Sequence, residues 1–170
     1  RVAASAELVQ NRRVLELGCG TGLVGIAAAI AGAETVTVTD GNPEILRLAE
    51  QNLKSNLPLD KQKRAAVRRL RWGNAEDLAQ CVSEVPYDVV LASDVAYDRD
   101  AFPALFSTIK VMLTQNPSAI AVLQMSPVVT DEGRGVEQVV RVARSSGFDV
   151  QLAELEETVE MVLRWKPGAA

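Results

Sequence analysis

Apolar and polar residues follow two different periodicities along the chain. Short β-branched or apolar runs predict five strands, at residues 14–17, 35–39, 66–70, 88–92 and 118–125. Apolar residues at helical spacing predict helices at residues 2–9, 23–31, 43–56, 75–81, 101–113 and 131–146. Residues 57–63 are expected to form a loop. Because strands and helices alternate, we expect an α/β fold with a mainly parallel sheet and helices on both faces.

The carboxyl-terminal part departs from this alternation. Residues 148–155 and 158–165 are two further apolar runs close together, and they predict a terminal antiparallel strand pair in a seven-stranded sheet. No internal repeat or linker-like stretch divides residues 1–170, which predicts a single domain. The chain opens on Arg1 rather than Met, so we expect the full protein to carry an amino-terminal segment before it.

The stretch from Val14 to Asp40 carries the clearest functional signal. It reads as a strand, a loop with Gly18, Gly20 and Gly22, an alanine-rich helix, and a second strand that ends at Asp40. Glycines let a backbone approach a ligand closely, and the following helix directs its unpaired N–H groups at the loop. A strand-end acid is placed to accept hydrogen bonds from a ribose diol. This βαβ unit therefore predicts a site for a nucleoside-containing cofactor.

Two kinds of cofactor remain open at this point. The segment Gly20–Gly25 matches the GxGxxG fingerprint of NAD-binding folds. In that fingerprint the first glycine follows the strand almost directly, whereas Gly18 and Cys19 come first here. Glu16, near the end of the first strand, suits a cofactor with a cationic amino-acid portion better than one with a pyrophosphate. An NAD(P)-dependent oxidoreductase is the lesser alternative, because no Tyr-x-x-x-Lys pair accompanies the motif.

Composition narrows the function classes further. The 170 residues are 48% hydrophobic, ample for one core, and a formal net charge of −4 argues against bulk binding to nucleic acid. No apolar run is long enough to span a membrane. The two cysteines, Cys19 and Cys81, lie far apart, which favours reduced thiols in a cytoplasmic or nuclear protein. The absence of histidine excludes histidine bases, Ser/His/Asp triads and histidine-ligated metals, and no metal site is expected.

Further candidates follow the third and fourth strands. Trp72 lies where its indole can stack on an adenine, although a core tryptophan at a strand end fits the pattern too. Ser93, Asp94 and Tyr97 follow the central strand, opposite the glycine loop. The acid and the phenol can converge to hold an incoming lysine ammonium, or they can be a helix-capping Asp and a surface Tyr. Because ligands of parallel sheets bind at the carboxyl ends of the strands, these residues predict one site.

Four motifs in order give a closer resemblance. ELGCGTGLVGI at 16–26, DGN at 40–42, LRWGN at 70–74 and YDVVLASDVAYD at 87–98 resemble the class I, seven-β-strand S-adenosylmethionine-dependent methyltransferases. Within that class the chain is similar to the protein-lysine methyltransferases with a DxxY motif. This group includes the calmodulin-lysine, valosin-containing-protein-lysine and elongation-factor-lysine methyltransferases. The resemblance implies a Rossmann-like fold, S-adenosylmethionine as cofactor, and methyl transfer to a lysine ε-amine of a protein substrate.

The resemblance also implies roles for individual residues. Its cofactor-binding positions correspond to Glu16, Gly18, Cys19, Gly20, Asp40, Trp72 and Ser93. The glycine loop would line the methionine part, the strand-end acid would take the ribose hydroxyls, and the indole would contact the adenine. The catalytic pair corresponds to Asp94, which docks and orients the lysine, and Tyr97, which shapes its channel. A general-base role for Asp94 is the less favoured alternative. A further cofactor-contacting Trp of the family falls before the start of this chain.

Several interpretations stay open beside this one. A methyltransferase of the same fold acting on a small molecule or another protein side chain is the first, and an inactive cofactor-binding partner protein is another. The basic stretch 61–71 is either a docking patch for an acidic protein or a solvated loop and strand edge. An acidic cluster near the terminal strand pair could attract a lysine-rich segment, and it consists of Glu154, Glu156, Glu157 and Glu160. The expected protein is a monomer with a protein substrate and no nucleic-acid or membrane partner.

Overall fold

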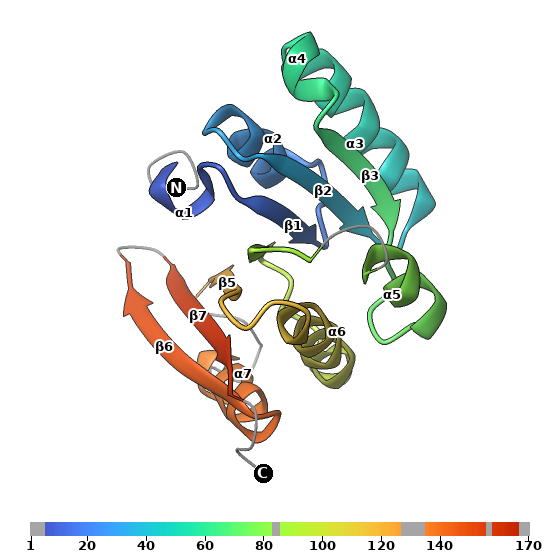
Figure 1. Ribbon diagram of the computed structural model, residues 1–170. Helices are drawn as coiled ribbons and strands as arrows, with labels where there is room; N and C mark the ends of the chain where they lie inside the picture. The colour runs from blue at the N-terminus through green and yellow to red at the C-terminus, as the bar shows by residue number, and fades with distance from the viewer. Residues whose placement is uncertain (1–5, 83–85, 127–134, 156–157, 167–170) are drawn as a thin grey trace.

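The computed structural model describes residues 6–82, 86–126, 135–155 and 158–166 (Figure 1). Its strands are β1 (Arg13–Leu17), β2 (Thr35–Asp40), β3 (Ala65–Arg69), β4 (Val89–Ser93), β5 (Ile120–Met125), β6 (Phe148–Glu154) and β7 (Val159–Trp165). Its α-helices are α1 (Ala6–Val9), α2 (Leu23–Ile30), α3 (Pro43–Asn56), α4 (Leu59–Gln62), α5 (Ala75–Val82), α6 (Phe102–Thr114) and α7 (Gly135–Ser145). A 3₁₀ turn, η2 (Arg99–Ala101), precedes α6.

The strands form one seven-stranded sheet in the order β3-β2-β1-β4-β5-β7-β6. Strands β1 to β5 pair in parallel, and β7 lies between β5 and β6, antiparallel to both. The predicted fold is therefore confirmed, a mainly parallel α/β sheet with a terminal antiparallel pair. Because β7 opposes both of its neighbours, β6 runs in the same direction as β1 to β5.

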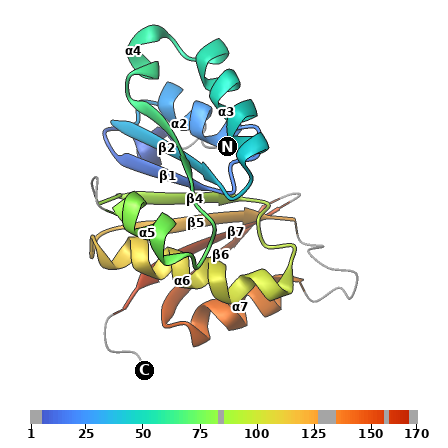
Figure 2. The ribbon, with the colours of Figure 1, turned by 90° about the vertical axis from the view of Figure 1, so that its right-hand side faces the viewer.

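Helices cover both faces of the sheet (Figure 2). Helices α2, α3 and α4 lie on one side, and α5, α6 and α7 lie on the other. Each layer has its own core, and neighbouring residues of a strand alternate between the two. Val14 packs with the α2 and α3 side and Leu15 with the α6 side, and both are fully buried. The same alternation in β4 confirms that this central strand is buried on both faces.

Local signals in the sequence explain where the helices begin. The Asn42 side chain accepts a 2.8 Å hydrogen bond from the Glu44 amide, and Pro43 takes the first helical position of α3. The predicted loop at 57–63 is wrong in part, because it contains α4. The carbonyl of Pro58 accepts from the Lys61 and Gln62 amides at 2.9 Å each, which closes this single turn.

Two predicted helices are described only in part. Residues 6–9 of the segment 2–9 and residues 135–145 of the segment 131–146 are helical, and their remaining residues at 2–5 and 131–134 lie outside the described ones. At the amino-terminal ends of the strands, Arg13 donates two side-chain hydrogen bonds to Asp88, and this contact ties β1 to β4.

Among the helices described, none is long and apolar enough to cross a membrane.

Candidate active site

A cavity of about 710 Å³ lies at the carboxyl ends of β1, β2 and β4. It is lined by every residue that the sequence singled out for cofactor binding or catalysis, namely Glu16, Gly18, Cys19, Gly20, Asp40, Trp72, Ser93, Asp94 and Tyr97. These residues come from separate parts of the chain, and the topology brings them together because parallel strands end at the same edge of the sheet. The roles of the individual residues stay predictions.

The loop after β1 forms one wall of the cavity. Gly18 has a φ of 63°, and a Cβ added there would lie 2.8 Å from Cγ1 of Val95. At Gly20 an added Cβ would meet no atom within 4 Å. The loop is fastened by a 2.8 Å hydrogen bond from the Cys19 amide to the Thr39 carbonyl. Glycine is therefore needed at Gly18 for packing, whereas Gly20 keeps space open on the cavity side.

Cys19 is a structural part of this loop. Burial raises the pKa of its thiol to about 12, and the charges of Glu16 and Asp40 add to the rise. The thiol is therefore protonated at neutral pH and is not a nucleophile.

Glu16 places a buried acid at the base of the cavity. Its side chain accepts a 2.9 Å hydrogen bond from the Gly25 amide, in the first turn of α2. Burial raises the pKa of the Glu16 carboxyl to about 8 against the effect of that hydrogen bond, and the charge of Asp40 raises it further. Because burial has removed water from this carboxyl, a cation bound next to it would strongly stabilise its ionised form.

Asp40 ends β2 beside the cavity. Its Oδ1 accepts a 2.9 Å hydrogen bond from the Asn42 amide, which fixes the orientation of the carboxylate. Its carbonyl accepts from the Leu70 amide at 3.0 Å, so the turn after β3 is tied to the same point. This arrangement suits recognition of a diol, for which a fixed carboxylate supplies two acceptor oxygens.

Trp72 follows β3 and lies where the core meets the cavity. Its half-buried indole packs against the core beneath α6 and also lines the cavity. Its Cζ2 lies 3.3 Å from the position of a Cβ added at Gly18. The indole therefore stands across from the glycine loop and offers an apolar surface to a planar ring. Trp165, by contrast, packs edge-on against Phe148 with 5.7 Å between ring centroids.

Asp94 and Tyr97 form the mouth of the cavity, after β4. Asp94 has a φ of 56°, a left-handed conformation that few residues other than glycine adopt, and its amide donates to the Gln124 carbonyl at 2.8 Å. Val95 and Ala96 are buried between them, whereas the Tyr97 side chain is 72% exposed. A strained backbone that presents an acid at a cavity mouth is typical of functional sites.

Sequence reasoning missed part of the lining. Leu23 begins α2, lines the cavity and is 69% exposed, so it adds a second large, exposed side chain to the lining besides Tyr97. From the sequence, Leu23 is expected only at the start of the predicted helix at 23–31, and no signal in the sequence marks it as a cavity residue. Arg71 also lines the cavity, next to Trp72, and pairs with Asp77 at 2.8 Å.

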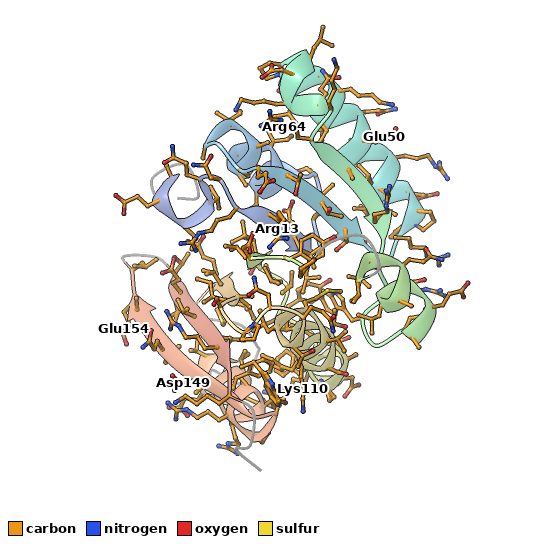
Figure 3. All side chains as sticks on the ribbon, in the orientation of Figure 1. Arg13, Glu50, Arg64, Lys110, Asp149 and Glu154 are labelled. Atoms are coloured by element: carbon orange, nitrogen blue, oxygen red, sulfur yellow. The ribbon has the colours of Figure 1, made fainter. Side chains whose placement is uncertain are left out.

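The acidic cluster is located in part. Ser93, Gln124 and Glu160 occupy one row across β4, β5 and β7, so Glu160 lies two strands from the cavity. Glu154 ends β6, as Figure 3 shows, and pairs across the hairpin with Val159. Glu156 and Glu157 lie outside the described residues. The predicted attraction of a lysine-rich segment stays a prediction.

Solved structures share this architecture. The chain is similar to the TehB-like SAM-dependent methyltransferase from Corynebacterium glutamicum, with a TM-score of 0.71, 16% identity, and coverage of 96% of this chain and 85% of that one. It is also similar to the glycopeptide N-methyltransferase MtfA complexed with S-adenosyl-L-methionine, with a TM-score of 0.74, 16% identity, and coverage of 96% and 87%. These likenesses confirm the Rossmann-like methyltransferase fold.

Relatives of known function are closer in sequence. The protein N-lysine methyltransferase METTL21A of Danio rerio is 42% identical over 102 residues, which cover 60% of this chain and 44% of the relative. The EEF1A lysine methyltransferase 3 of Mus musculus is 32% identical over 152 residues, which cover 89% and 60%. The calmodulin-lysine N-methyltransferase of Arabidopsis thaliana is 28% identical over 149 residues, which cover 87% and 47%. The chain thus spans between 44% and 60% of the length of these relatives.

A family model described as lysine methyltransferase matches residues 3–133. That range is well over half of the chain, and it holds the glycine loop, Asp40, Trp72 and the segment from Asp94 to Tyr97. The resemblance stated from the four motifs is therefore confirmed, and the chain belongs to the lysine methyltransferase family.

Proposed function

We propose that this chain is the catalytic core of a protein that transfers a methyl group from S-adenosylmethionine to a lysine ε-amine of a protein substrate. The observation that carries the proposal is the single cavity shared by the glycine loop, Glu16, Asp40, Trp72 and Asp94. Membership of the lysine methyltransferase family supports the reaction and the substrate class. The chain spans only part of its relatives, so the activity of the whole protein belongs to the proposal.

The residues of the cavity fit S-adenosylmethionine by their chemistry. Glu16 offers a buried carboxyl to the cationic amino-acid portion, and the glycine loop leaves room beside it. Asp40 would accept from the ribose hydroxyls, and Trp72 would cover the adenine. A pyrophosphate would instead face the carboxyl of Glu16 in the same cavity. This charge pattern favours S-adenosylmethionine over NAD.

Positioning is the main task of the chain in this reaction. When bound, S-adenosylmethionine supplies a methyl group on a sulfonium sulfur, which an amine can attack in line at the methyl carbon while the thioether leaves. Holding the two reactants in a near-attack geometry supplies a large part of the rate enhancement, and no covalent intermediate with the protein is needed. Asp94 would dock and orient the lysine at the mouth, and the exposed ring of Tyr97 would guide its aliphatic stem.

The lysine must lose a proton before it attacks. Its unperturbed pKa is about 10.4, and only the neutral amine has a lone pair. A carboxylate such as that of Asp94 favours the charged ammonium, whereas desolvation favours the neutral amine. Asp94 therefore suits capture and orientation of the lysine rather than a role as general base. The open mouth beside Tyr97 gives the released proton a direct route to water.

Calorimetric titration tests the cofactor first. We expect the protein to bind S-adenosylmethionine and S-adenosylhomocysteine, to ignore NAD, and to lose binding in the Asp40→Ala variant. Binding of NAD alone would overturn the proposal. Transfer of a radiolabelled methyl group to proteins of a cell extract, followed by identification of the modified residue, then tests the acceptor. Label on a small molecule, or on a side chain other than lysine, would reject the lysine assignment.

We propose in addition that the protein acts as a monomer in the cytoplasm or nucleus, without nucleic acid or membrane. Its two free cysteines and its net charge of −4 support this proposal. Light scattering of the purified protein and imaging of a tagged copy in cells test it. A stable dimer, or a signal confined to a membrane compartment, would contradict it.

A further inference from the structure

A strip of positive charge follows the outer edge of the sheet at β3. Residues 61–71 contain six basic residues and no Asp or Glu, in a chain of net charge −4. Lys61 donates to the Ala29 carbonyl, and Arg71 pairs with Asp77. The other four basic residues are exposed, namely Lys63, Arg64, Arg68 and Arg69. These four side chains and the outer edge of β3 are called the β3 strip below.

The backbone of the β3 strip is open to an added strand. Among the strands that the structure describes, β3 pairs with β2 on one side and has no neighbour on the other. The Arg64 carbonyl accepts from Val36 and the Leu70 amide donates to Asp40, so the even-numbered residues face β2. Backbone groups alternate in a parallel ladder, and those of Ala65, Val67 and Arg69 therefore face outward. Such an edge is a template for a further strand.

A groove of about 510 Å³ lies between this edge and α3. Small side chains of β3 line it, at Ala65, Ala66 and Val67, and α3 contributes basic side chains from Arg47 and Lys54. Glu50 also lines the groove, but its carboxylate is already paired with Lys54 at 2.7 Å. Figure 3 shows Glu50 on α3 and Arg64 close to the start of β3. The groove thus has room for side chains of an added strand beside a surplus of positive charge.

We propose that the β3 strip docks an acidic, extended segment of the methyl-accepting protein by strand addition. The proposal rests on the proposed function for the identity of the partner. β3 spans about 16 Å along its five residues, and Leu70, Arg71 and Trp72 lead directly from it into the lining of the cofactor cavity. A segment docked on β3 would therefore flank the target lysine and increase its local concentration at the mouth.

Other occupants fit the strip less well. A second copy of the chain would pair β3 antiparallel with β3 and bring Arg64 of each copy towards the Arg68 and Arg69 end of the other, which like-charge repulsion opposes. Residues 61–71 contain no aromatic side chain for base stacking, and the outward amides and carbonyls match a polypeptide rather than a phosphate backbone. The acids Asp149 and Glu154 lie on β6, at the opposite edge of the sheet (Figure 3).

A labelled peptide tests docking directly. The probe is a ten-residue peptide of alternating Glu and Val with a fluorescent label, and anisotropy gives its Kd. We expect the Arg64→Glu/Arg69→Glu double variant to bind about tenfold more weakly, and binding by the wild type to weaken with salt. The matched control, Arg141→Glu/Arg144→Glu, changes two exposed arginines on α7 and leaves the Kd unchanged. Equal loss in both double variants would reject the β3 strip as the site.

Amide exchange distinguishes strand addition from loose charge attraction. We expect the outward amides of Val67 and Arg69 to exchange quickly in the free protein and to be protected by the peptide, while the amides of Ala66 and Arg68 change little. Val67→Pro removes one outward amide donor without removing a hydrogen bond to β2. The variant should therefore keep the fold and bind the peptide more weakly. Peptide binding without protection of these amides would overturn the proposal, as would stronger protection by a single-stranded RNA of ten nucleotides.

A methylation assay separates this proposal from the proposed function. We expect the peptide to slow transfer of labelled methyl to proteins of a cell extract by the wild type, and to have little effect on the Arg64→Glu/Arg69→Glu variant. Methyl transfer that the peptide does not affect rejects the β3 strip as a substrate dock and leaves the reaction intact. If the protein labels no lysine at all, the proposed function fails, and with it the identity of the docked partner.

Discussion

The side-chain carboxyl of Glu16 and the amide nitrogen of Gly25 are joined by a hydrogen bond of 2.9 Å. This bond connects β1 to the first turn of α2 across the glycine loop, so the acid and the helix form one rigid unit. The amide is one of the donors that a helix leaves unpaired at its start, and the positive end of the helix dipole favours an acid there. Burial nevertheless raises the pKa of the Glu16 carboxyl, and this rise has effects on stability and on binding that can be measured.

The stability of the ligand-free protein should depend on pH through Glu16. Its pKa of about 8 in the folded state lies above the ordinary value of 4.5, so between these values the folded chain holds a proton that the unfolded chain has released. The free energy of unfolding should therefore fall as the pH rises, by on the order of 2 kcal/mol between pH 6 and pH 8. Urea unfolding at a series of pH values measures this slope.

The Glu16→Gln variant is the control for that slope. Glutamine keeps an oxygen that can accept from Gly25 and does not titrate. Histidine cannot contribute to the slope because the chain has none, and Asp77 and Asp88 titrate below this pH window because arginine partners lower their pKa values. The variant should show a flat profile from pH 6 to pH 8. A slope unchanged by the substitution would mean that another group carries the proton.

Cofactor binding should release a proton at neutral pH. S-adenosylmethionine carries an ammonium and a sulfonium, and the approach of these positive charges favours the ionised form of Glu16. Its pKa of about 8 keeps the carboxyl mostly protonated beforehand. Titration calorimetry in two buffers with different ionisation enthalpies should give different binding enthalpies for the wild type. Glu16→Gln should bind more weakly with no buffer dependence. Identical enthalpies in both buffers for the wild type would contradict this coupling.

Asp94→Asn should weaken binding of the protein substrate and leave binding of the cofactor unchanged. Asparagine tolerates the left-handed backbone at φ 56° but cannot neutralise a lysine ammonium. We expect KM for the substrate to rise about tenfold, with the Kd of S-adenosylmethionine unchanged. Asp100→Asn, at an exposed position outside the cavity, serves as the matched control. Full turnover by Asp94→Asn at an unchanged KM would refute the docking role.

Two glycines should separate folding from ligand binding. A Cβ at Gly25 would overlap Cγ1 of Val38 and lie 2.8 Å from Oε2 of Glu16, so Gly25→Ala should destabilise the protein by about 2 kcal/mol. Gly20 has a φ of 52° and open space around it, so Gly20→Asn should fold normally and lose the cofactor. Thermal unfolding and calorimetry measure the two effects. A stable Gly25→Ala protein would show that α2 can move away from β2.

The parts that local chemistry governs were predictable from the sequence. The strand from Thr35 to Asp40 and the helix that begins at Pro43 follow from β-branched residues, a turn and an N-cap. The meeting of Glu16, Asp40 and Asp94 also followed, because parallel strands end at one edge. The sequence did not reveal that Leu23 faces the opening, since exposed and buried leucines have the same spacing on a short helix.

Long-range pairings were beyond a local reading. The insertion of β7 between β5 and β6 depends on which apolar strand faces fit together, and no turn residue encodes it. The ion pair of Arg13 with Asp88 joins residues 75 positions apart, and each is an ordinary surface residue in its own segment. The turn of α4 depends on Gln62, whose side chain donates to the Lys54 and Leu57 carbonyls at the end of α3.

The place of β7 also sets an order of assembly during synthesis. Every described residue that lines the cofactor cavity precedes Asp98, so the ribosome has delivered these residues before it makes the last two strands. Until β7 arrives, the outer edge of β5 has no partner, and buried residues such as Val122 and Leu123 belong to that unfinished edge. A nascent chain can thus have its cofactor site while its sheet still needs protection from aggregation.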